Sequence, residues 1–196
     1  FYFDDLELTD DYEVPAPIEF DTIDFETNSP NFSGFGGNSF AISGNPDASG
    51  LNKSATVGET IHGSEVWGGL SSDFLGKLDF SSKSKVAIKV WSPKAGITVK
   101  LKLETKVDGN IAVEKDVTTT VSNAWEKLTF DFTGEASNKY DRVSVFFDFG
   151  SSDATTFYFD DIEQTDGSVV PGPIDFEDDL STVEAGAGTT VELIDN

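Results

Sequence analysis

The side chains best suited to chemistry in this chain are tryptophans that alternate with charged groups. Trp91 follows Lys89 in a segment whose intervening residues Val86, Ile88 and Val90 are apolar. Successive residues of a strand point to opposite faces, so Lys89 and Trp91 are predicted to share a solvated face. A flat aromatic ring rimmed by hydrogen-bonding groups suits a sugar ring, which has apolar C–H faces and polar edges. An amphipathic ring on a solvated sheet is the alternative.

The next segment repeats this alternation. Apolar residues occupy every second position from Val99 to Leu103, and the positions between and after them are Lys100, Lys102 and Glu104. We predict that this segment is the neighbouring strand of the same sheet. Its polar side chains would then lie beside Trp91 and contact sugar hydroxyls.

A second tryptophan and the only histidine lie in the glycine-rich segment HGSEVWGG. Glu65 and Trp67 are predicted to point outward and Val66 inward, which would add Glu65 and Trp67 to the binding face. A core position at the edge of a sandwich is the alternative for Trp67. His62 is a candidate for ligand contact, with a surface or structural role as its alternative.

Two further aromatic residues are assigned from their strands. Trp125 opens a segment in which Leu128, Phe130 and Phe132 form an apolar stripe, and we predict that Trp125 belongs to the core. Phe146 alternates away from its apolar neighbours and is the one phenylalanine predicted to lie on a binding face.

The sequence contains few residues of the types that catalysis commonly requires. There is no cysteine, and a single histidine leaves almost nothing for a histidine-based dyad or a zinc site. A glycosidase needs two carboxyls about 5 to 9.5 Å apart, and Glu65 and Glu104 could share one face, but the sequence shows neither their separation nor their burial. We predict that the protein is not an enzyme.

The elements that must position these residues are β-strands. Period-two alternation recurs in most informative segments, and turn sequences such as SGFGG, NPD, SPKAG and VDGN separate them. No stretch carries an apolar helical period over ten residues. The predicted fold is all-β, a two-sheet antiparallel β-sandwich of the jelly-roll kind, in which the first and last strands are neighbours.

An internal repeat sets the domain boundaries. The opening FYFDDLELTD returns as FYFDDIEQTD 156 positions later. Residues 1–13 are therefore predicted to be the last strand of a preceding repeat, 14–17 a linker, 18–166 one complete module, 167–173 a second linker, and 174–196 the first strands of a following repeat. The chain is interpreted as part of a tandem array.

Charge is distributed unevenly along the chain. The net charge is −23, but residues 1–26 and 160–196 hold 21 of the 36 acidic residues and none of the 13 basic ones. Residues 27–159 are thus nearly neutral, which argues against nucleic acid as a partner because phosphate contacts need a basic face. No apolar run approaches the ~20 residues that a membrane helix needs, so we predict no membrane insertion by this chain.

The order of several motifs resembles that of a known family. IDFE, NPDASGLNKS, EVWGGL, KVWSPKAGITVKLKLE, AWEKLTFDF and VFFDFG leading into FYFDDI follow one another across residues 18–166. This order is similar to that of family 4-type, galactose-binding-like carbohydrate-binding modules. It resembles especially the repeated versions in secreted glucan-degrading and glucan-binding proteins of marine Bacteroidetes.

The resemblance implies binding of polysaccharide, with β-1,3-glucan of the laminarin kind as first choice, in an extracellular, cell-surface protein of polysaccharide utilization. Tandem repetition favours binding, since avidity grows with copy number. Two alternatives stay open. One is a calcium-stiffened structural or adhesive spacer repeat. The other is an accessory module of a glycoside hydrolase that binds another glycan, such as a uronate polymer held by clustered lysines.

The resemblance also implies a structural calcium ion. Glu26 and Asp160 are the side-chain ligands that it suggests, with Asn45 and Asp47 in a loop whose residues 45–53 supply carbonyls. Calcium takes six to eight oxygen ligands from such groups. Solvated acids that blunt a strand edge are the alternative.

Overall fold

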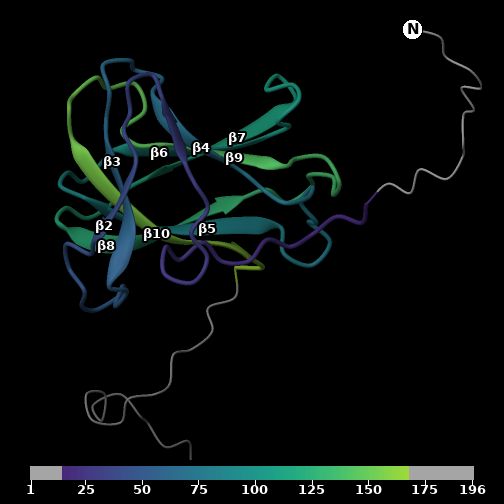
Figure 1. Cartoon of the computed structure of the whole chain (residues 1–196), viewed down its shortest axis with the longest axis horizontal. Coiled ribbons are helices and arrows are strands. Elements are labelled where there is room, and N and C mark those ends of the chain that lie inside the picture. The colour runs from purple at the N-terminus through teal and green to yellow at the C-terminus, as the bar shows by residue number, and fades with distance from the viewer. Residues whose placement is uncertain (1–14, 168–196) are drawn as a thin grey trace, which may run out of the picture.

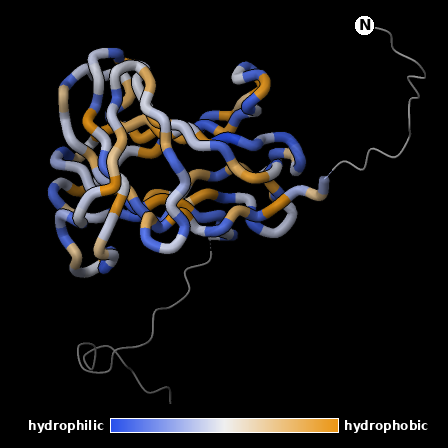
Figure 2. The backbone as a smooth tube through the Cα atoms, in the orientation of Figure 1, coloured by the Kyte–Doolittle hydropathy of each residue, from blue (hydrophilic) through white to orange (hydrophobic). Residues whose placement is uncertain are grey.

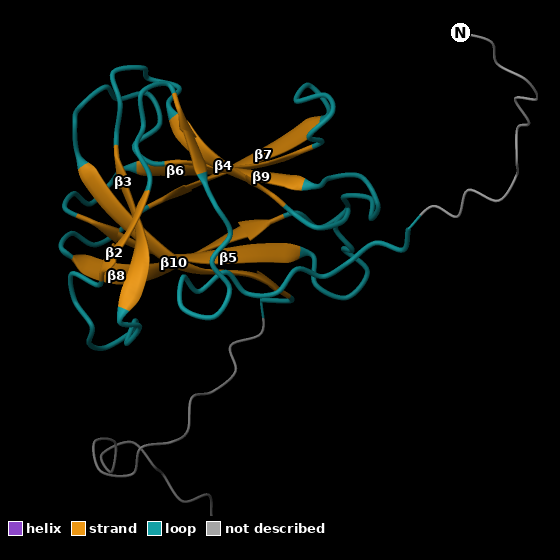
Figure 3. Ribbon diagram, viewed as in Figure 1, coloured by secondary structure: helices purple, strands orange, loops and turns teal. Residues whose placement is uncertain are grey.

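The computed structural model describes residues 15–167, which form two antiparallel sheets packed face to face (Figure 1). Every described element is a strand, as the ribbon in Figure 3 shows. The predicted all-β sandwich is confirmed. No helix in residues 15–167 is long and apolar enough to cross a membrane.

The first sheet has the order β1-β4-β9-β6-β7 and the second has the order β2-β3-β10-β5-β8. The strands of the first sheet are β1 (Ser33–Phe35), β4 (Gly69–Asp73), β9 (Arg142–Phe146), β6 (Thr98–Glu104) and β7 (Ala112–Thr118). Those of the second are β2 (Ala41–Gly44), β3 (Thr56–Ile61), β10 (Thr156–Thr165), β5 (Lys85–Ser92) and β8 (Ala124–Asp131).

The core fills the space between the two sheets, where Figure 2 shows the hydrophobic segments facing one another. The alternating residues of β5, β6, β8 and β9 point into it, as the sequence predicts. Aromatic rings close one half of the core around Phe159, whose ring meets those of Phe25, Phe32, Phe40 and Phe147. Phe159 also lies against Gly58, where a Cβ would come within 2.8 Å of its ring.

The beginning and end of the predicted module meet. Ile23 and Ile162 form an antiparallel bridge, with hydrogen bonds in both directions between their backbones. The amide of Phe20 also donates to the side chain of Gln164. The predicted proximity of first and last strands is therefore confirmed, while the predicted flanking repeats at 1–13 and 174–196 lie outside the described residues.

One predicted strand pairing is wrong. β5 and β6 follow each other in sequence but belong to different sheets, because β5 pairs with β8 and β10 whereas β6 pairs with β7 and β9. Trp91 therefore lies on the outer face of the second sheet, on the far side of the sandwich from Lys100, Lys102 and Glu104. The alternation within each strand was sufficient to predict its faces, but it is the same whether the chain turns back or crosses between sheets.

A loop covers part of the outer face of the second sheet. Trp125 is only 8% exposed, yet it points away from the core, and its Nε1 donates to Asn45 Oδ1 and to the carbonyl of Asp47 at 3.0 Å each. The Asn45 side chain in turn donates to the carbonyls of Asn52 and Ser54. The predicted burial of Trp125 is confirmed, but this loop, rather than the core stripe, buries it.

We expect Trp125→Ala to destabilise the module by about 3 kcal/mol, near the lower end for loss of a large buried aromatic residue. The change removes both the ring contact and the hydrogen bonds that hold the 45–54 loop. A domain of this size should then lose roughly 6 to 12 °C of thermal midpoint, measured by calorimetry. Trp91→Ala, at the directly opposed and more exposed position of β5, is the matched control. A midpoint lowered equally by both changes would contradict a special role for the Trp125 hydrogen bonds.

Candidate functional site

The outer face of the first sheet is a regular grid of side chains set by the strand register. Its middle row, from β7 to β1, is Glu114, Lys102, Ser144, Ser71 and Ser33. The row on one side is Asp116, Lys100, Phe146, Gly69 and Phe35, and the row on the other is Ala112, Glu104, Arg142 and Asp73. Small side chains thus occupy three neighbouring positions of the middle row, between an aromatic row and a charged row.

The aromatic side of this face is a continuous chain of rings. Trp67 lies nearly parallel to Phe35, with centroids 6.3 Å apart and planes at 14°. Phe35 meets Phe146 edge to face at 5.5 Å, and Phe146 meets Phe149 in the same way at 5.6 Å. Trp67 is the solvent-exposed end of this series of rings, since the residue is 51% exposed.

An open depression of about 400 Å³ lies between the aromatic and polar rows. It is lined by Phe35, Trp67, Lys102, Glu104, Glu114, Ser144, Phe146 and Phe149. Four strands and two loops contribute to the depression, which explains why the segment around any single motif predicts it poorly. Of the predicted binding residues, the structure brings together Trp67, Lys102 and Glu104, and it adds Phe146 as the alternation suggested.

The charged groups of this face are paired with one another. Lys100 Nζ lies 3.0 Å from Glu114 and 2.9 Å from Asp116, and over the ring of Phe149 at 4.8 Å. Burial lowers the pKa of Lys100, but hydrogen bonds to the two carboxylates outweigh it and leave the pKa raised. Lys102 pairs with Glu104 at 2.6 Å, and Glu104 also accepts a hydrogen bond from Ser144.

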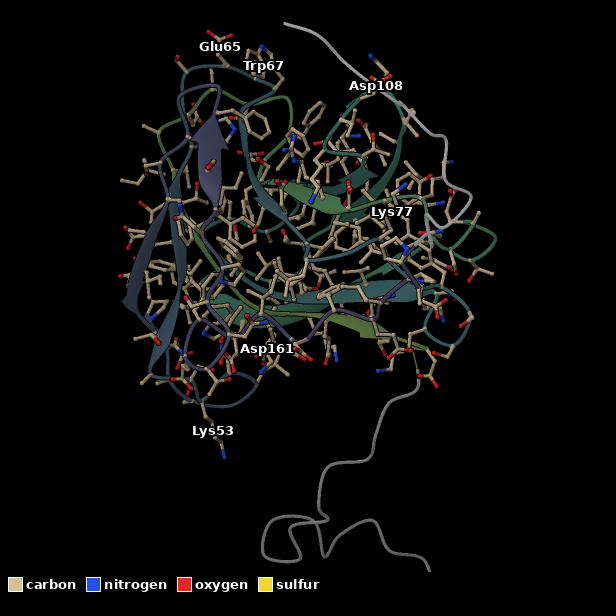
Figure 4. All side chains as sticks on the ribbon, turned by 45° about the vertical axis from the view of Figure 1, so that its right-hand side comes forward. Lys53, Glu65, Trp67, Lys77, Asp108 and Asp161 are labelled. Atoms are coloured by element: carbon tan, nitrogen blue, oxygen red, sulfur yellow. The ribbon has the colours of Figure 1, made fainter. Side chains whose placement is uncertain are left out.

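Trp67 is carried by a loop between β3 and β4, not by a strand. Val66, predicted to point inward, is exposed, and its carbonyl accepts a hydrogen bond from Gly150 N. Glu65 is exposed and lies beside Trp67 at the end of the molecule opposite Lys53 and Asp161 (Figure 4). It does not line the depression. The alternation rule failed here because the segment is not extended.

Two glycine pairs hold this loop against the turn that follows Phe35. A Cβ on Gly63 would come within 2.3 Å of the Gly36 carbonyl oxygen and of the Gly37 carbonyl carbon, and a Cβ on Gly36 would come within 2.6 Å of Gly68 Cα. These backbones can approach so closely only because the residues lack side chains. The amide of Glu65 donates to the Gly36 carbonyl at 3.3 Å. This glycine clasp places Trp67 over Phe35.

His62 lies beneath the glycine clasp. It is 2% exposed, its Nδ1 is 2.9 Å from the carbonyl of Gly63, and its backbone amide donates to Thr155. Asn38 reaches the same place, since its Oδ1 accepts the amide hydrogen of Gly63 at 2.9 Å. The position favours the structural alternative for His62, because a buried ring under the loop has no direct access to a ligand on the face.

Trp91 has different neighbours on the second sheet. Its ring meets that of Tyr158 edge to face at 5.5 Å, and it stands directly opposite Trp125. Burial raises the pKa of the Tyr158 hydroxyl, and the nearby Glu59 carboxylate raises it further. The sugar contact that the sequence predicts at Trp91 would form a separate site from the depression beside Trp67, because the two residues lie on opposite sides of the sandwich.

The predicted calcium ligands converge on one loop. Asp160 is fully buried on the outer face of β10, beside a bulge at Asp161, and its Oδ2 accepts a hydrogen bond from Asn52 at 2.9 Å. Its Oδ1 is buried and has no hydrogen-bond partner among the described residues. Burial raises the pKa of Asp160, and the hydrogen bonds from Asn52 and Ser54 only partly oppose this.

The other three predicted ligands already have structural roles. Glu26 accepts hydrogen bonds from the amides of Ala55 and Thr56, at the end of the same loop. Asn45 Oδ1 is occupied by Trp125, and Asp47 Oδ1 accepts from Ser49. Residues 15–167 contain no cluster of three acidic, histidine or cysteine residues placed to hold a metal. A cation here would therefore depend on Asp160 and on backbone carbonyls.

Comparison with solved structures places the fold among β-sandwich carbohydrate-binding modules. The xylan-binding domain from family 22 has a TM-score of 0.52 at 15% identity, covering 78% of this chain and 97% of that one. The family 22 xylan-binding domain of a Paenibacillus barcinonensis protein gives 0.51 at 20% identity, with 72% and 96% covered.

A family 11 module of Clostridium thermocellum, solved with a β-1,3-1,4-mixed-linked tetrasaccharide, gives 0.52 at 13% identity, with 74% and 94% covered. No protein-family model matches the chain. No curated protein matches it either. The jelly-roll fold of carbohydrate-binding modules is thus confirmed, whereas the neighbours belong to families 22 and 11 and do not support membership of family 4 or a marine glucan context.

The glycine clasp generates a prediction about the loop that bears Trp67. Gly63→Ala should lower the affinity for any ligand that binds the Trp67–Phe35 ring pair by about tenfold, since the new methyl group must push the loop away from the Gly36–Gly37 backbone. The Trp67 fluorescence maximum, followed against a Trp91→Phe, Trp125→Phe background, should shift as the stacked ring is released. Gly44→Ala is the matched control because a Cβ there meets nothing within 4 Å. Unchanged fluorescence and affinity in Gly63→Ala would show that the loop adapts.

Proposed function

We propose that this module binds a neutral polysaccharide, without catalysis, on the outer face of the first sheet. The observation that carries the proposal is the depression bounded by the Trp67–Phe35–Phe146–Phe149 rings on one side and by hydrogen-bonding side chains on the other. Pyranose rings present an apolar face and a polar edge, and this arrangement offers a surface to each. The solved modules with this fold include ones that bind xylan and mixed-linked β-glucan.

The pairing of charges favours a neutral ligand over a uronate polymer. The face carries three bases, Lys100, Lys102 and Arg142, and each has a carboxylate partner within 3.0 Å on the same face. A polyuronate would have to compete with those carboxylates for the bases. Within neutral glycans, the family resemblance of the sequence favours β-1,3-glucan of the laminarin type, in an extracellular, cell-surface protein.

Catalysis is not supported by the geometry of the acids. Glu104 is engaged by Lys102 and Ser144 at the floor of the depression, and Glu65 stands outside it on the loop. The buried acid with a raised pKa, Asp160, lies on the opposite sheet. Glu114, the other carboxyl that lines the depression, is paired with Lys100 at 3.0 Å, so both carboxyls of the depression are held by lysines and neither is free to act as the acid or base of a glycosidase.

The principal test compares two tryptophans on opposite sheets. Stacking of a planar ring on an aromatic side chain is worth about 1 to 3 kcal/mol by analogy with nucleobases, so Trp67→Ala should weaken glucan binding by about tenfold or more. Its thermal midpoint should change little, because the ring is half exposed. Trp91→Ala is the control and should retain affinity. Isothermal calorimetry with laminarin, after a glycan array has confirmed binding, measures both.

The opposite result, loss with Trp91→Ala alone, would move the site to the second sheet. An array without any bound glycan would favour the structural spacer. The dependence of affinity on salt distinguishes a neutral glucan from a uronate polymer as the ligand. Affinity for a neutral glucan should stay constant up to seawater ionic strength, whereas a uronate polymer should be released progressively as salt rises.

We propose in addition that Asp160 holds a structural calcium ion. The fit rests on its buried Oδ1, which lacks a partner among the described residues, since a buried carboxylate without a cation is costly. When bound, the ion would supply the positive charge that the Asp160 site lacks. Asp160 would be its carboxylate ligand, and Glu26 lies at the other end of the loop that covers Asp160.

Chelation should lower the thermal midpoint of the wild type by many degrees, because a ligand that binds only the native state adds about 4 kcal/mol at a thousandfold excess over its Kd. The thermal midpoint of Asp160→Asn should not respond to EGTA. This variant should be at least as stable as the chelated wild type, since an amide of similar shape replaces the buried charge. Asp161→Asn, which breaks only the ion pair with Lys89, should keep the calcium response. A wild-type midpoint that ignores both calcium and EGTA would remove the ion from the module.

A further inference from the structure

We propose that the binding face has a second, polar subsite formed by Ser33, Ser71, Asp73 and Arg142, so that the module binds an internal stretch of an extended glycan chain lying across the strands. This inference rests on the proposed function and extends the site beyond the aromatic depression. The two subsites lie along one row of outward-facing side chains, which we call the serine lane. This row consists of Glu114, Lys102, Ser144, Ser71 and Ser33.

The second subsite is a separate hollow on the same face. It is an open depression of about 350 Å³. Its lining consists of Pro30, Asn31, Ser33, Ser71, Ser72, Asp73 and Arg142. The strands that form it are β1, β4 and β9, whereas the aromatic depression is centred on β9, β6 and β7. The residues Pro30 and Asn31, just before β1, bound its outer side.

The two hollows are joined by small side chains. Ser144, which lines the aromatic depression, stands directly opposite Ser71, which lines the second one, and Ser71 stands opposite Ser33. On the aromatic side of this junction the β4 position is Gly69, which has no side chain. A Cβ at Gly69 would come within 2.8 Å of the Phe146 ring and within 2.9 Å of the Phe35 ring. Nothing bulky on β4 therefore interrupts the lane.

The dimensions of the lane follow from sheet geometry. Strands lie about 4.8 Å apart, so a row that crosses five strands is about 19 Å long. Rows on one face are two residues apart, about 6.8 Å, so the aromatic and charged rows are separated by about 14 Å across the serine row. This is a trough that is wide enough for one chain of sugar rings and several rings long.

The chemistry of the second subsite is that of hydroxyl recognition. Arg142 Nε donates to Asp73 Oδ1 at 2.6 Å, and both side chains are partly exposed. The hydrogen bond from Arg142 lowers the pKa of Asp73, so its carboxylate remains an acceptor at neutral pH. An arginine has five N–H donors and only the one on Nε is used by Asp73. The pair thus presents donors and an acceptor side by side at zero net charge, which suits vicinal hydroxyls of a neutral sugar.

The test is the dependence of affinity on chain length. Laminari-oligosaccharides from disaccharide to hexasaccharide are titrated calorimetrically into the wild type, Arg142→Gln and Ser71→Leu. The wild type should gain affinity with each added unit until the lane is filled. Both variants should bind the shortest ligands like the wild type and lose about fivefold to tenfold for the longest. Arg142→Gln removes the donors, whereas Ser71→Leu blocks the lane without removing the ion pair.

Lys127→Gln is the matched control, because Lys127 forms an exposed ion pair with Glu163 on the other sheet. It should follow the wild-type curve at every length. Equal loss at all lengths, or no loss at the longest, would overturn the second subsite while a Trp67→Ala effect left the proposed function intact. Absence of binding by the wild type and by Trp67→Ala alike would overturn both.

Discussion

The binding face depends on the apolar core between the two sheets. Because side chains alternate along a strand, each residue that points into the core directs the side chains of its two neighbours onto the outer face. Val143 and Val145 are fully buried, so Ser144 and Phe146 must point outward. The same holds for Leu101, whose burial directs the lysines on either side of it onto the face. A register slip of one residue would bury those charges, and the cost of that burial locks the grid in place.

Sequence patterns predicted each strand's faces better than the relations between strands. The alternation correctly assigned Phe146, Lys102 and Glu104 to an outer face, and the aromatic-rich terminal segments to neighbouring positions. It could not predict that the chain after Trp91 crosses to the other sheet, because the alternation contains no information on pairing partners. The predicted single site with two tryptophans therefore separates into two faces.

The Trp67 loop shows a second limit of sequence reasoning. A period-two rule applies only to extended backbone, and residues 62–68 are not extended. The signal that could have identified the glycine clasp was present in the two glycine pairs, at 36–37 and at 63 and 68, on either side of aromatic residues. Glycine pairs indicate close backbone approach, but only the fold shows that these two approach one another.

Electrostatics separates the roles of the two outer faces. On the outer face of the first sheet Lys100, Lys102 and Arg142 each have an acidic partner, so the face can make hydrogen bonds without a strong field. On the second sheet Asp160 is buried under a loop, and this burial raises the pKa of Asp160 despite the hydrogen bonds from Asn52 and Ser54. The first arrangement suits recognition of a neutral ligand and the second suits a cation. The net acidity of the chain arises elsewhere, mostly outside residues 27–159.

The two ends of the described chain lie beside the same end of β10. Phe20 bonds Gln164 near the end of β10, whereas His62, beneath the Trp67 loop, bonds Thr155 just before β10 begins. The described chain therefore enters and leaves beside one end of a ten-residue strand, and the aromatic rings lie toward the other. An extended strand of that length spans about 30 Å. The described ends of the chain therefore lie away from the Trp67–Phe35–Phe146–Phe149 rings and do not line the aromatic depression.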